Sequence, residues 1–249
     1  MSLTAKPGTG RTFFIADLHL TDERPLATGR FFRFLEEQVA GADGLYILGD
    51  LFEVWFGDDH QEQIARDTAR RLKSLVESGT PVYFMHGNRD FMLAKRYAAR
   101  SGLTLLADPT RIDLYGVPTL LMHGDTLCID DVAYQTFRRR IRHPLTHALL
   151  HRLPLVLRQR VARRVQSTSK VQKAAKSAEI MDVNVEEVVR VLREQHAGRL
   201  IHGHTHRPAQ HLHPVDGRPR ERWVVPDWYE RWGYVACSAE GCTLVVEAL

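Results

Sequence analysis

His202-Gly-His-Thr-His-Arg-Pro208 is the stretch of this 249-residue chain from which its fold is most directly inferred. It follows the apolar pair Leu200-Ile201, which predicts a turn at the carboxyl end of a buried strand. Two histidines one residue apart, flanked by glycine and proline, are typical of a turn that carries ligands. Taken alone the pattern is weak, because His-x-His also arises by chance and His204 could be an ordinary surface residue.

Four earlier runs repeat this arrangement, and each comes directly after an apolar segment that predicts a strand. They are Asp17-Leu-His19, Gly49-Asp50, Gly87-Asn88 and His123-Gly124. Segments with helical spacing of apolar residues separate them, at 25–39, 61–78, 92–100 and 184–194. Short strands are expected over the C-terminal remainder. Strands alternating with helices, followed by a strand-rich end, predict an α/β sandwich in which helices flank a β core.

Composition is that of an ordinary soluble protein, with 44% hydrophobic and 26% charged residues. The length fits one large domain or a domain with an insertion. No apolar run reaches the roughly 18 residues of a membrane span and no signal peptide is recognisable, so we expect a cytoplasmic protein. Cys237 and Cys242 could approach each other across a turn at Glu240-Gly241. A reducing compartment favours two free thiols there over a disulfide.

Charge is distributed unevenly along the chain. Residues 132–178 contain twelve Lys and Arg and no Asp or Glu, whereas the whole chain carries only +4, so the remainder is net acidic. A mildly acidic body with one strongly basic segment predicts a polyanionic partner: nucleic acid, an anionic membrane surface or a phosphorylated ligand.

The polar strand ends together supply a set of ligands for divalent metal. Carboxyl ends of buried strands are where α/β folds place their ligand sites. Mixed imidazole, carboxylate and amide ligation suits Mn²⁺, Fe²⁺ or Zn²⁺ better than Ca²⁺. Seven ligands are too many for one tetrahedral ion and fit two ions that share a carboxylate. The candidate ligands are Asp17, His19, Asp50, Asn88, His123, His204 and His206, with His202 left as a structural residue at a strand end.

These blocks resemble those of the calcineurin-like metallophosphoesterases. Four fuller strings are similar to a narrower family, the UDP-2,3-diacylglucosamine pyrophosphatases of lipid A biosynthesis, over roughly residues 12–237. The strings are Phe14-Ile-Ala-Asp-Leu-His-Leu20, Gly49-Asp-Leu-Phe-Glu-Val-Trp-Phe-Gly-Asp-Asp59, His86-Gly-Asn-Arg-Asp-Phe91 and His123-Gly-Asp125. The long block that starts at Gly49 is the most specific of them.

The resemblance implies a fold and a metal site. The fold would be a calcineurin-like sandwich of two β-sheets flanked by helices, forming a single domain over 1–249 with a helical cap insertion at about 128–180. The cofactor would be two Mn²⁺, with other divalent ions possible. One ion would be held by Asp17, His19, Asp50 and His206, and the other by Asp50, Asn88, His123 and His204, with Asp50 bridging.

The resemblance also implies an activity. A metal-activated water would attack the α-phosphorus of UDP-2,3-diacylglucosamine and release UMP and 2,3-diacylglucosamine 1-phosphate (lipid X). The protein would be a monomer, peripheral on the cytoplasmic face of the inner membrane, with no nucleic-acid partner. Catalytic roles would belong to Asp50, Asn88, Arg89 and His204. Substrate contacts would come from Asn88, Arg89, Asp131, Tyr134, Ser169, Lys173, Lys176 and His204.

Arg89 favours a pyrophosphate bond over a simple ester. Related phosphomonoesterases have histidine after Gly-Asn, which can protonate an alkoxide leaving group, whereas a guanidinium cannot give up its proton. A phosphate leaving group, with a second pKa of about 6, needs little such help. The arginine instead offers fixed positive charge to a diphosphate. The alternative is that Arg89 only pairs with Asp90.

Ser169, Lys173 and Lys176 lie within about two helical turns, so they can share one face of a helix. A solvated face is the ordinary interpretation, but the absence of acids and the match to the family favour a head-group site. Gln166 stands where some members of the family carry arginine, which leaves the detailed head-group contacts open. Apolar residues of the same segment could line an acyl pocket, and its arginines could hold anionic headgroups.

Two other functions remain open. One is a different dinuclear-metal nucleotide pyrophosphatase or phosphodiesterase, such as a nuclease. The other is a basic nucleic-acid- or membrane-binding module with a structural metal, although structural sites use fewer, usually sulfur-rich ligands.

Overall fold

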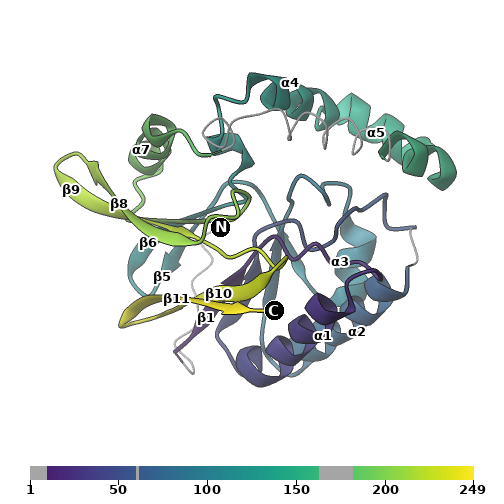
Figure 1. Ribbon diagram of the computed structural model, residues 1–249, viewed down its shortest axis with the longest axis horizontal. Helices are drawn as coiled ribbons and strands as arrows, with labels where there is room; N and C mark the ends of the chain where they lie inside the picture. Colours follow the sequence, from purple (N-terminus) through teal and green to yellow (C-terminus); the bar gives the residue numbers. More distant parts are fainter. Residues whose placement is uncertain (1–9, 60–61, 163–181) are drawn as a thin grey trace.

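The computed structural model describes residues 10–59, 62–162 and 182–249. Two β-sheets pack face to face, and helices cover the outer side of each (Figure 1). The six-stranded sheet has the order β11-β10-β1-β2-β3-β4 and the five-stranded sheet the order β5-β6-β7-β9-β8. The predicted α/β sandwich with two sheets flanked by helices is therefore confirmed.

The six-stranded sheet combines parallel strands with one antiparallel hairpin. Its strands are β1 (Thr12–Ile15), β2 (Gly44–Ile47), β3 (Val82–Met85), β4 (Thr104–Leu106), β10 (Arg231–Ser238) and β11 (Gly241–Ala248). The first four are parallel to one another, and β10 runs antiparallel to β1. The five-stranded sheet consists of β5 (Thr110–Leu114), β6 (Val117–Met122), β7 (Arg199–His202), β8 (Ala209–Val215) and β9 (Arg218–Val224). In it β6, β7 and β9 are parallel.

The central parallel strands β1, β2 and β3 are apolar throughout because both of their faces are covered. In β1, Phe13 and Ile15 point into the cluster under the helices, whereas Phe14 points into the cluster between the sheets. Alternate residues thus face opposite layers, and both need to be apolar. This explains why the parallel strands appear in the sequence as unbroken apolar runs rather than as alternating patterns.

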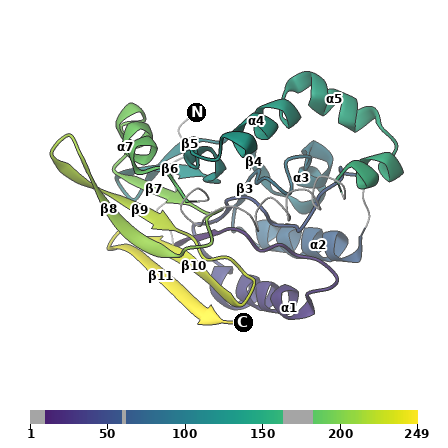
Figure 2. The same ribbon diagram turned by 45° about the horizontal axis from the view of Figure 1, so that its top comes forward.

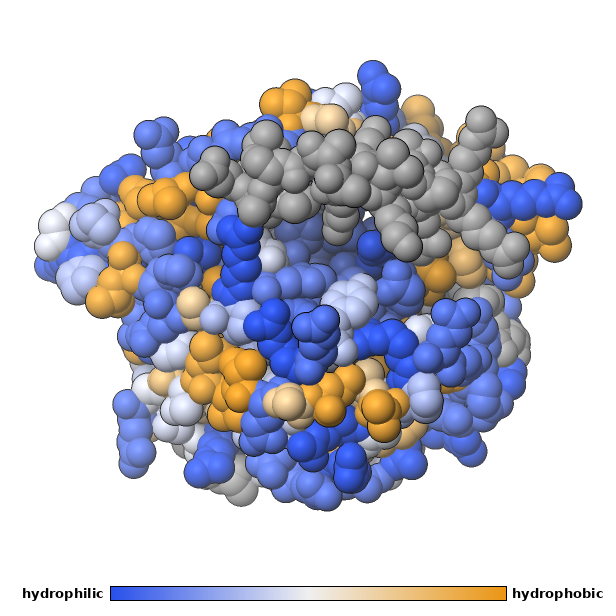
Figure 3. Space-filling model, in the orientation of Figure 1, coloured by the Kyte–Doolittle hydropathy of each residue, from blue (hydrophilic) through white to orange (hydrophobic). Residues whose placement is uncertain are grey.

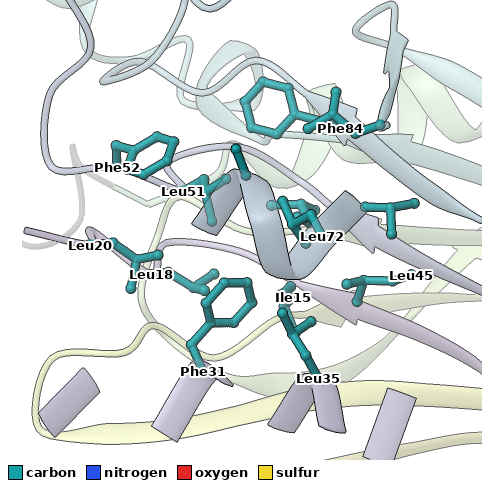
Figure 4. Close-up of a cluster of buried hydrophobic side chains, with 14 of the residues drawn as sticks. Ile15, Leu18, Leu20, Phe31, Leu35, Leu45, Leu51, Phe52, Leu72 and Phe84 are labelled. Carbon is teal, nitrogen blue, oxygen red and sulfur yellow. The ribbon is translucent and has the colours of Figure 1, made fainter. Parts of the chain in front are cut away.

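Three helices cover the six-stranded sheet and one covers the other. α1 (Pro25–Phe34) continues as a π-helix (Leu35–Val39), and α2 (Gln63–Glu77) and α3 (Lys95–Ser101) lie beside it. Figure 4 shows Phe31 and Leu35 from this first helical stretch, with Leu72 from α2, gathered around Ile15 and Leu45 of the sheet. α7 (Val185–Glu194) closes a smaller cluster on the five-stranded sheet.

Between β6 and β7 the chain leaves the sandwich and forms a helical extension, which we call the cap. A 3₁₀ turn (Asp125–Leu127) leads to α4 (Val132–Ile141), α5 (Pro144–Arg152) and a helical segment over 155–162. Both views show the cap helices extending beside the body rather than packing into it (Figures 1 and 2). The helical character predicted for this stretch holds over its described part. The boundaries of about 128–180 remain a prediction.

The prediction of two free thiols is wrong. Cys237 and Cys242 form a disulfide, with their Cα atoms 4.0 Å apart. The two residues face each other directly in the register of the β10–β11 hairpin, which sequence spacing alone does not specify. Cys128 is free and buried. Within the described ranges, no helix is long and apolar enough to cross a membrane.

Candidate metal centre

All seven predicted ligands lie in loops at one edge of the two sheets. Asp17 and His19 follow β1, Asp50 follows β2 and Asn88 follows β3; His123 follows β6, and His204 and His206 follow β7. Since the strands within each set are parallel, their carboxyl ends meet at the same edge.

The first group of side chains surrounds Asp17. His206 Nε2 is 3.4 Å and His19 Nε2 is 4.0 Å from Asp17 Oδ1. Atoms of these three residues that could bind a metal all lie within 4.8 Å of one another. Asp17 is fully buried and His19 is 2% exposed, whereas His206 is partly exposed. One ion could be held here from the protein side with an open side left for a ligand.

The second group shares Asp50 with the first. Its Oδ2 is 3.8 Å from His19 Nε2, and its Oδ1 is 4.0 Å from His123 Nε2. His123 Nε2 also lies 3.2 Å from Asn88 Oδ1, and the rings of His123 and His204 are 5.0 Å apart. The two carboxylate oxygens of Asp50 thus face different imidazoles, which is the arrangement that a bridging carboxylate needs.

The donor set fits a divalent cation. Asp17 Oδ1 and His19 Nε2 are buried and make no hydrogen bond within the described parts of the chain. Buried polar atoms are almost always satisfied, so such atoms facing one another fit a site that binds a cation. His123 Nδ1 lies 2.8 Å from the Leu48 carbonyl oxygen. Donation to that oxygen orients the ring with the lone pair of Nε2 toward Asp50, as expected of a metal-binding histidine.

Five of these residues have left-handed backbone conformations. Their φ angles are 54° for Asp17, 50° for His19, 54° for Asp50, 70° for His204 and 55° for His206. Residues other than glycine rarely adopt this region, and such conformations concentrate at functional sites where the surrounding structure enforces them. The loops are therefore shaped for the positions of their side chains.

The glycines of the motifs are required by close backbone contact. A Cβ atom on Gly87 would lie 2.1 Å from Asp50 Oδ1, and one on Gly49 would lie 2.6 Å from Gly87 Cα. The Gly-Asp and Gly-Asn loops thus pack backbone against backbone. Any side chain at either glycine would push the two loops apart.

Asp90 connects the same two loops. Its carboxylate accepts hydrogen bonds from the backbone N–H groups of Gly87 (2.9 Å), Asp50 (3.3 Å) and Leu51 (2.7 Å). Burial, together with the negative charge of Asp50, raises the pKa of Asp90 to about 7. The Arg89 guanidinium lies instead 3.8 Å from Glu53, so a simple Arg89–Asp90 pair does not account for the arginine.

The buried part of the site carries mainly negative charge. Burial alone would lower the pKa of His123, but Asp50, Asp125 and Asp17 reverse this effect and raise it to about 9. Burial would likewise raise the pKa of Asp17, yet the neighbouring imidazoles, His206 first, hold it well below its usual range. The carboxylates thus favour positive charge among them, which a bound cation would supply.

Sequence reasoning missed two residues that contact His19. The ring of Tyr229 stacks on the imidazole with centroids 4.8 Å apart, and its hydroxyl donates to Glu53 Oε2 over 3.2 Å. Glu53 Oε2 is also 3.2 Å from His19 Nδ1. Glu53 lies in the long block that starts at Gly49, which could have indicated it. No sequence feature connects Tyr229 with a residue 210 positions earlier.

The predicted substrate contacts in the cap are only partly described. Tyr134 stacks on His204, with ring centroids 5.9 Å apart, and its hydroxyl donates to Asp125 over 2.7 Å. Asp131 caps α4 by accepting from the Tyr134 N–H. Ser169, Lys173 and Lys176, like Gln166, lie outside the described residues. The substrate roles of Asp131 and Tyr134 stay predictions.

His202 has the surroundings of a structural residue. It is fully buried at the end of β7, and its ring nitrogens lie 2.8 Å from the Gly203 carbonyl oxygen and 3.3 Å from an Arg222 nitrogen. Burial, followed by the positive charge of Arg222, lowers its pKa to about 3. His202 is therefore a neutral imidazole that supports the loop.

Comparison with known proteins agrees with this geometry. Residues 10–208 match the family model described as calcineurin-like phosphoesterase, so the chain belongs to the calcineurin-like phosphoesterase family. Divalent metal ions are the cofactors that this family implies.

Within that family the chain is similar to proteins named UDP-2,3-diacylglucosamine hydrolase. The relative from Enterobacter sp. (strain 638) is 47% identical over 234 residues, covering 94% of this chain and 98% of its own. Those from Pseudomonas aeruginosa (strain UCBPP-PA14) and Azotobacter vinelandii are 49% and 50% identical, covering 92% and 90% of this chain and 95% and 92% of their own. The resemblance inferred from the motifs is confirmed.

Proposed function

We propose that this protein hydrolyses the pyrophosphate bond of UDP-2,3-diacylglucosamine to UMP and 2,3-diacylglucosamine 1-phosphate in lipid A biosynthesis. The similarity to the named hydrolases supports the substrate. The observation that carries the chemistry is the position of Asp50, whose two carboxylate oxygens face different imidazoles. A diphosphate needs the two centres of positive charge that such an arrangement can hold.

Two Mn²⁺ are the proposed cofactor. Asp17, His19, Asp50 and His206 would hold one ion, and Asp50, Asn88, His123 and His204 the other. When bound, two such ions activate water at neutral pH and neutralise the charge of an in-line phosphoryl displacement. The buried residues of each set lie on the protein side, whereas Asn88, His204 and His206 are partly exposed toward the substrate side.

Arg89 is proposed to hold the diphosphate. Its side chain is 21% exposed and its Nη1 lies 3.8 Å from Glu53 Oε1, so it can present charge to an anion beside Asn88. It cannot protonate a leaving group, which a phosphate leaving group does not require. His204 is proposed to contact the same group: its backbone N–H donates to Asp17 Oδ2 over 2.7 Å, which holds its loop in the site, and its ring lies 5.0 Å from that of His123.

The apolar side chains of the cap support a lipid substrate and attachment to a membrane. Leu145 is 75%, Leu149 61% and Val156 58% exposed. Figure 3 shows hydrophobic side chains at the end of the molecule where α5 lies. Arginines in the same helices can attract anionic lipid headgroups, each contributing about 1 kcal/mol. We propose that this face rests on the cytoplasmic side of the inner membrane.

Product analysis tests the activity. Metal-free protein supplied with Mn²⁺ and UDP-2,3-diacylglucosamine in detergent should form both products, identified by mass spectrometry. In ¹⁸O water the label should enter UMP, because the water attacks the α-phosphorus. Label in the lipid product would contradict that direction of attack. Equal turnover of nucleotides without acyl chains would favour the nucleotide pyrophosphatase alternative.

Liposome flotation tests the membrane proposal. The protein should float with vesicles that contain anionic lipid, and the double variant Leu145→Ser, Leu149→Ser should float less. Its turnover of substrate in detergent should be retained. Equal flotation of both proteins would contradict the proposed membrane face.

A further inference from the structure

One side of α4 faces the metal-bearing loops. This side carries Tyr134 and Arg138, and Arg142 follows at the residue that ends the helix. The three are spaced four residues apart, so they fall on one face of the helix. All three are half-buried, whereas the neighbouring Arg139 and Arg140 are exposed. The arginines of this helix therefore divide into a group turned to the body and a group turned to solvent.

Tyr134 and Arg138 attach α4 to the loop that carries His123. Asp125, two residues after that histidine, is fully buried. Its Oδ2 accepts from the Tyr134 hydroxyl (2.7 Å) and from Arg138 Nε (2.6 Å). Arg142 Nη2 lies 3.7 Å from the same oxygen. One buried carboxylate thus faces three residues of the cap.

Arg142 also contacts the loop that carries Asn88. Its Nη2 donates to the carbonyl oxygen of Gly87 over 2.7 Å. The N–H of Gly87 donates to Asp90 on the body side, so this residue is held from both directions. Gly87 packs directly against Asp50, because a Cβ atom on it would lie 2.1 Å from Asp50 Oδ1.

We propose that Arg142 is a positioning residue, which holds the Gly87-Asn88 loop in the geometry that binds the second cation. The contact between the cap and this loop would then raise the affinity of the site for its second cation. The proposal rests on the proposed role of Asn88 as a ligand. Hydrogen bonds to charged donors are stronger than neutral ones, and outer partners of metal ligands commonly affect affinity by about 10- to 100-fold.

Mn²⁺ titration of the full-length protein by isothermal calorimetry tests the proposal. Arg142→Ala should weaken one of two Mn²⁺ sites by about tenfold to a hundredfold and leave the other within about threefold. Arg142→Lys should recover part of the loss. Arg140→Ala, an exposed arginine of the same helix, is the matched control and should bind Mn²⁺ as the wild type does.

Kinetics separate positioning from substrate contact. With Arg142→Ala, kcat should fall at limiting Mn²⁺ and recover with excess Mn²⁺, while KM for the lipid at saturating Mn²⁺ stays within about twofold. Unchanged Mn²⁺ affinity with a raised KM would overturn the proposal and make Arg142 a substrate contact. If the alanine variant does not fold, as judged by circular dichroism, Arg142→Lys and Arg142→Gln carry the same test.

The wild type distinguishes this inference from the proposed function. Wild-type protein that binds two Mn²⁺ and hydrolyses the lipid supports the function whatever the Arg142 variants do. Normal Mn²⁺ binding by all Arg142 variants alongside it would overturn the positioning role alone.

Discussion

The body and the cap bring residues to the same site by different means. In the body, Asp17 and His123 are fully buried and Asp50 is 2% exposed, each at the end of a strand covered on both faces. In the cap, α4 and α5 contribute no buried residue, and Leu145 is 75% exposed. The body holds its ligands by packing, whereas the cap is held mainly by polar contacts.

Those contacts occur at the two ends of the described cap. Arg138 and Arg142 attach α4 to the metal-bearing loops, as described above. Arg158, which is 6% exposed, donates to the Phe56 carbonyl oxygen and to both carboxylate oxygens of Asp59. Regions with few buried apolar contacts open locally at lower free energy than a packed core. The difference teaches that the candidate ligands lie in the more tightly packed region, whereas the cap, through which we propose that the lipid is bound, is expected to open at lower free energy.

Removal of the shared carboxylate should have the largest effect. Asp50→Ala removes the oxygens that face both sets of imidazoles. We expect kcat to fall by about 10³-fold or more, equivalent to roughly 4 kcal/mol of transition-state stabilisation. Steady-state hydrolysis of the lipid measures it, with the exposed Asp22→Ala as control. Turnover within tenfold of wild type would contradict the two-metal scheme.

Truncation of one apolar side chain in each region compares their packing directly. Phe31→Ala leaves a cavity in the main core, where the residue is fully buried, and should lower the free energy of unfolding by about 3–5 kcal/mol. Leu149→Ala removes a side chain that is 61% exposed and should change the free energy of unfolding by about 0.5 kcal/mol or less. Urea denaturation measures both. Equal losses would mean that the cap packs as tightly as the body.

Asp108 lies where the body meets the cap, and its ionisation should make the stability of this contact depend on pH. Its side chain is 7% exposed and 3.7 Å from Arg138; burial, then the charge of Asp125, raises its pKa from 3.8 to about 6. A raised pKa of the folded state favours folding below about pH 4, and this contribution is lost as the pH rises through about 6.

Asp108→Asn should therefore be more stable than the wild type at pH 8, by up to about 3 kcal/mol, with the gain shrinking toward pH 4. Urea denaturation at pH 8 and pH 5 measures the gain, and Asp22→Asn is an exposed control. A variant less stable than wild type at pH 8 would show that the ion pair with Arg138 outweighs burial.

Gly57→Ala should release the distal end of the cap and have its main effect there, with only a modest loss of overall stability. Gly57 has φ +134°, and a Cβ there would lie 2.0 Å from Arg158 Nη1. Gly79→Ala is the matched control, because its φ is +103° but nothing lies within 4 Å of the added atom. Both variants should lose about 1–2 kcal/mol to backbone strain.

Only Gly57→Ala should also displace Arg158. Amide hydrogen exchange across 153–162 should accelerate by about tenfold or more in that variant, because charged hydrogen bonds of about 1.5–3 kcal/mol are lost. Exchange there should be unchanged in Gly79→Ala. Unchanged exchange in both variants would mean that Arg158 does not anchor the cap.

The ligand positions could be predicted from the sequence because they depend on local order. Each ligand follows its strand within a few residues, and parallel strands must end at a common edge. Sequence spacing allowed Cys237 and Cys242 to approach each other, but an expected reducing compartment favoured free thiols. The register of the hairpin, which sets the two residues directly opposite each other, decides the disulfide. Stacking of Tyr229 on His19 and the attachment of Arg158 to Asp59 join segments far apart in the chain, which no local pattern specifies.

The sequence by itself determined the class of fold, the nature of the site and its candidate ligands, since apolar periodicity and residue type are properties of short segments. Only the tertiary structure decided which imidazole faces each carboxylate oxygen of Asp50, and how the cap meets the body. Those depend on distances between loops that the chain connects only through folded sheets. His204 and His206 illustrate both parts: their spacing was evident from the sequence, and packing places one ring beside His123 and the other beside Asp17.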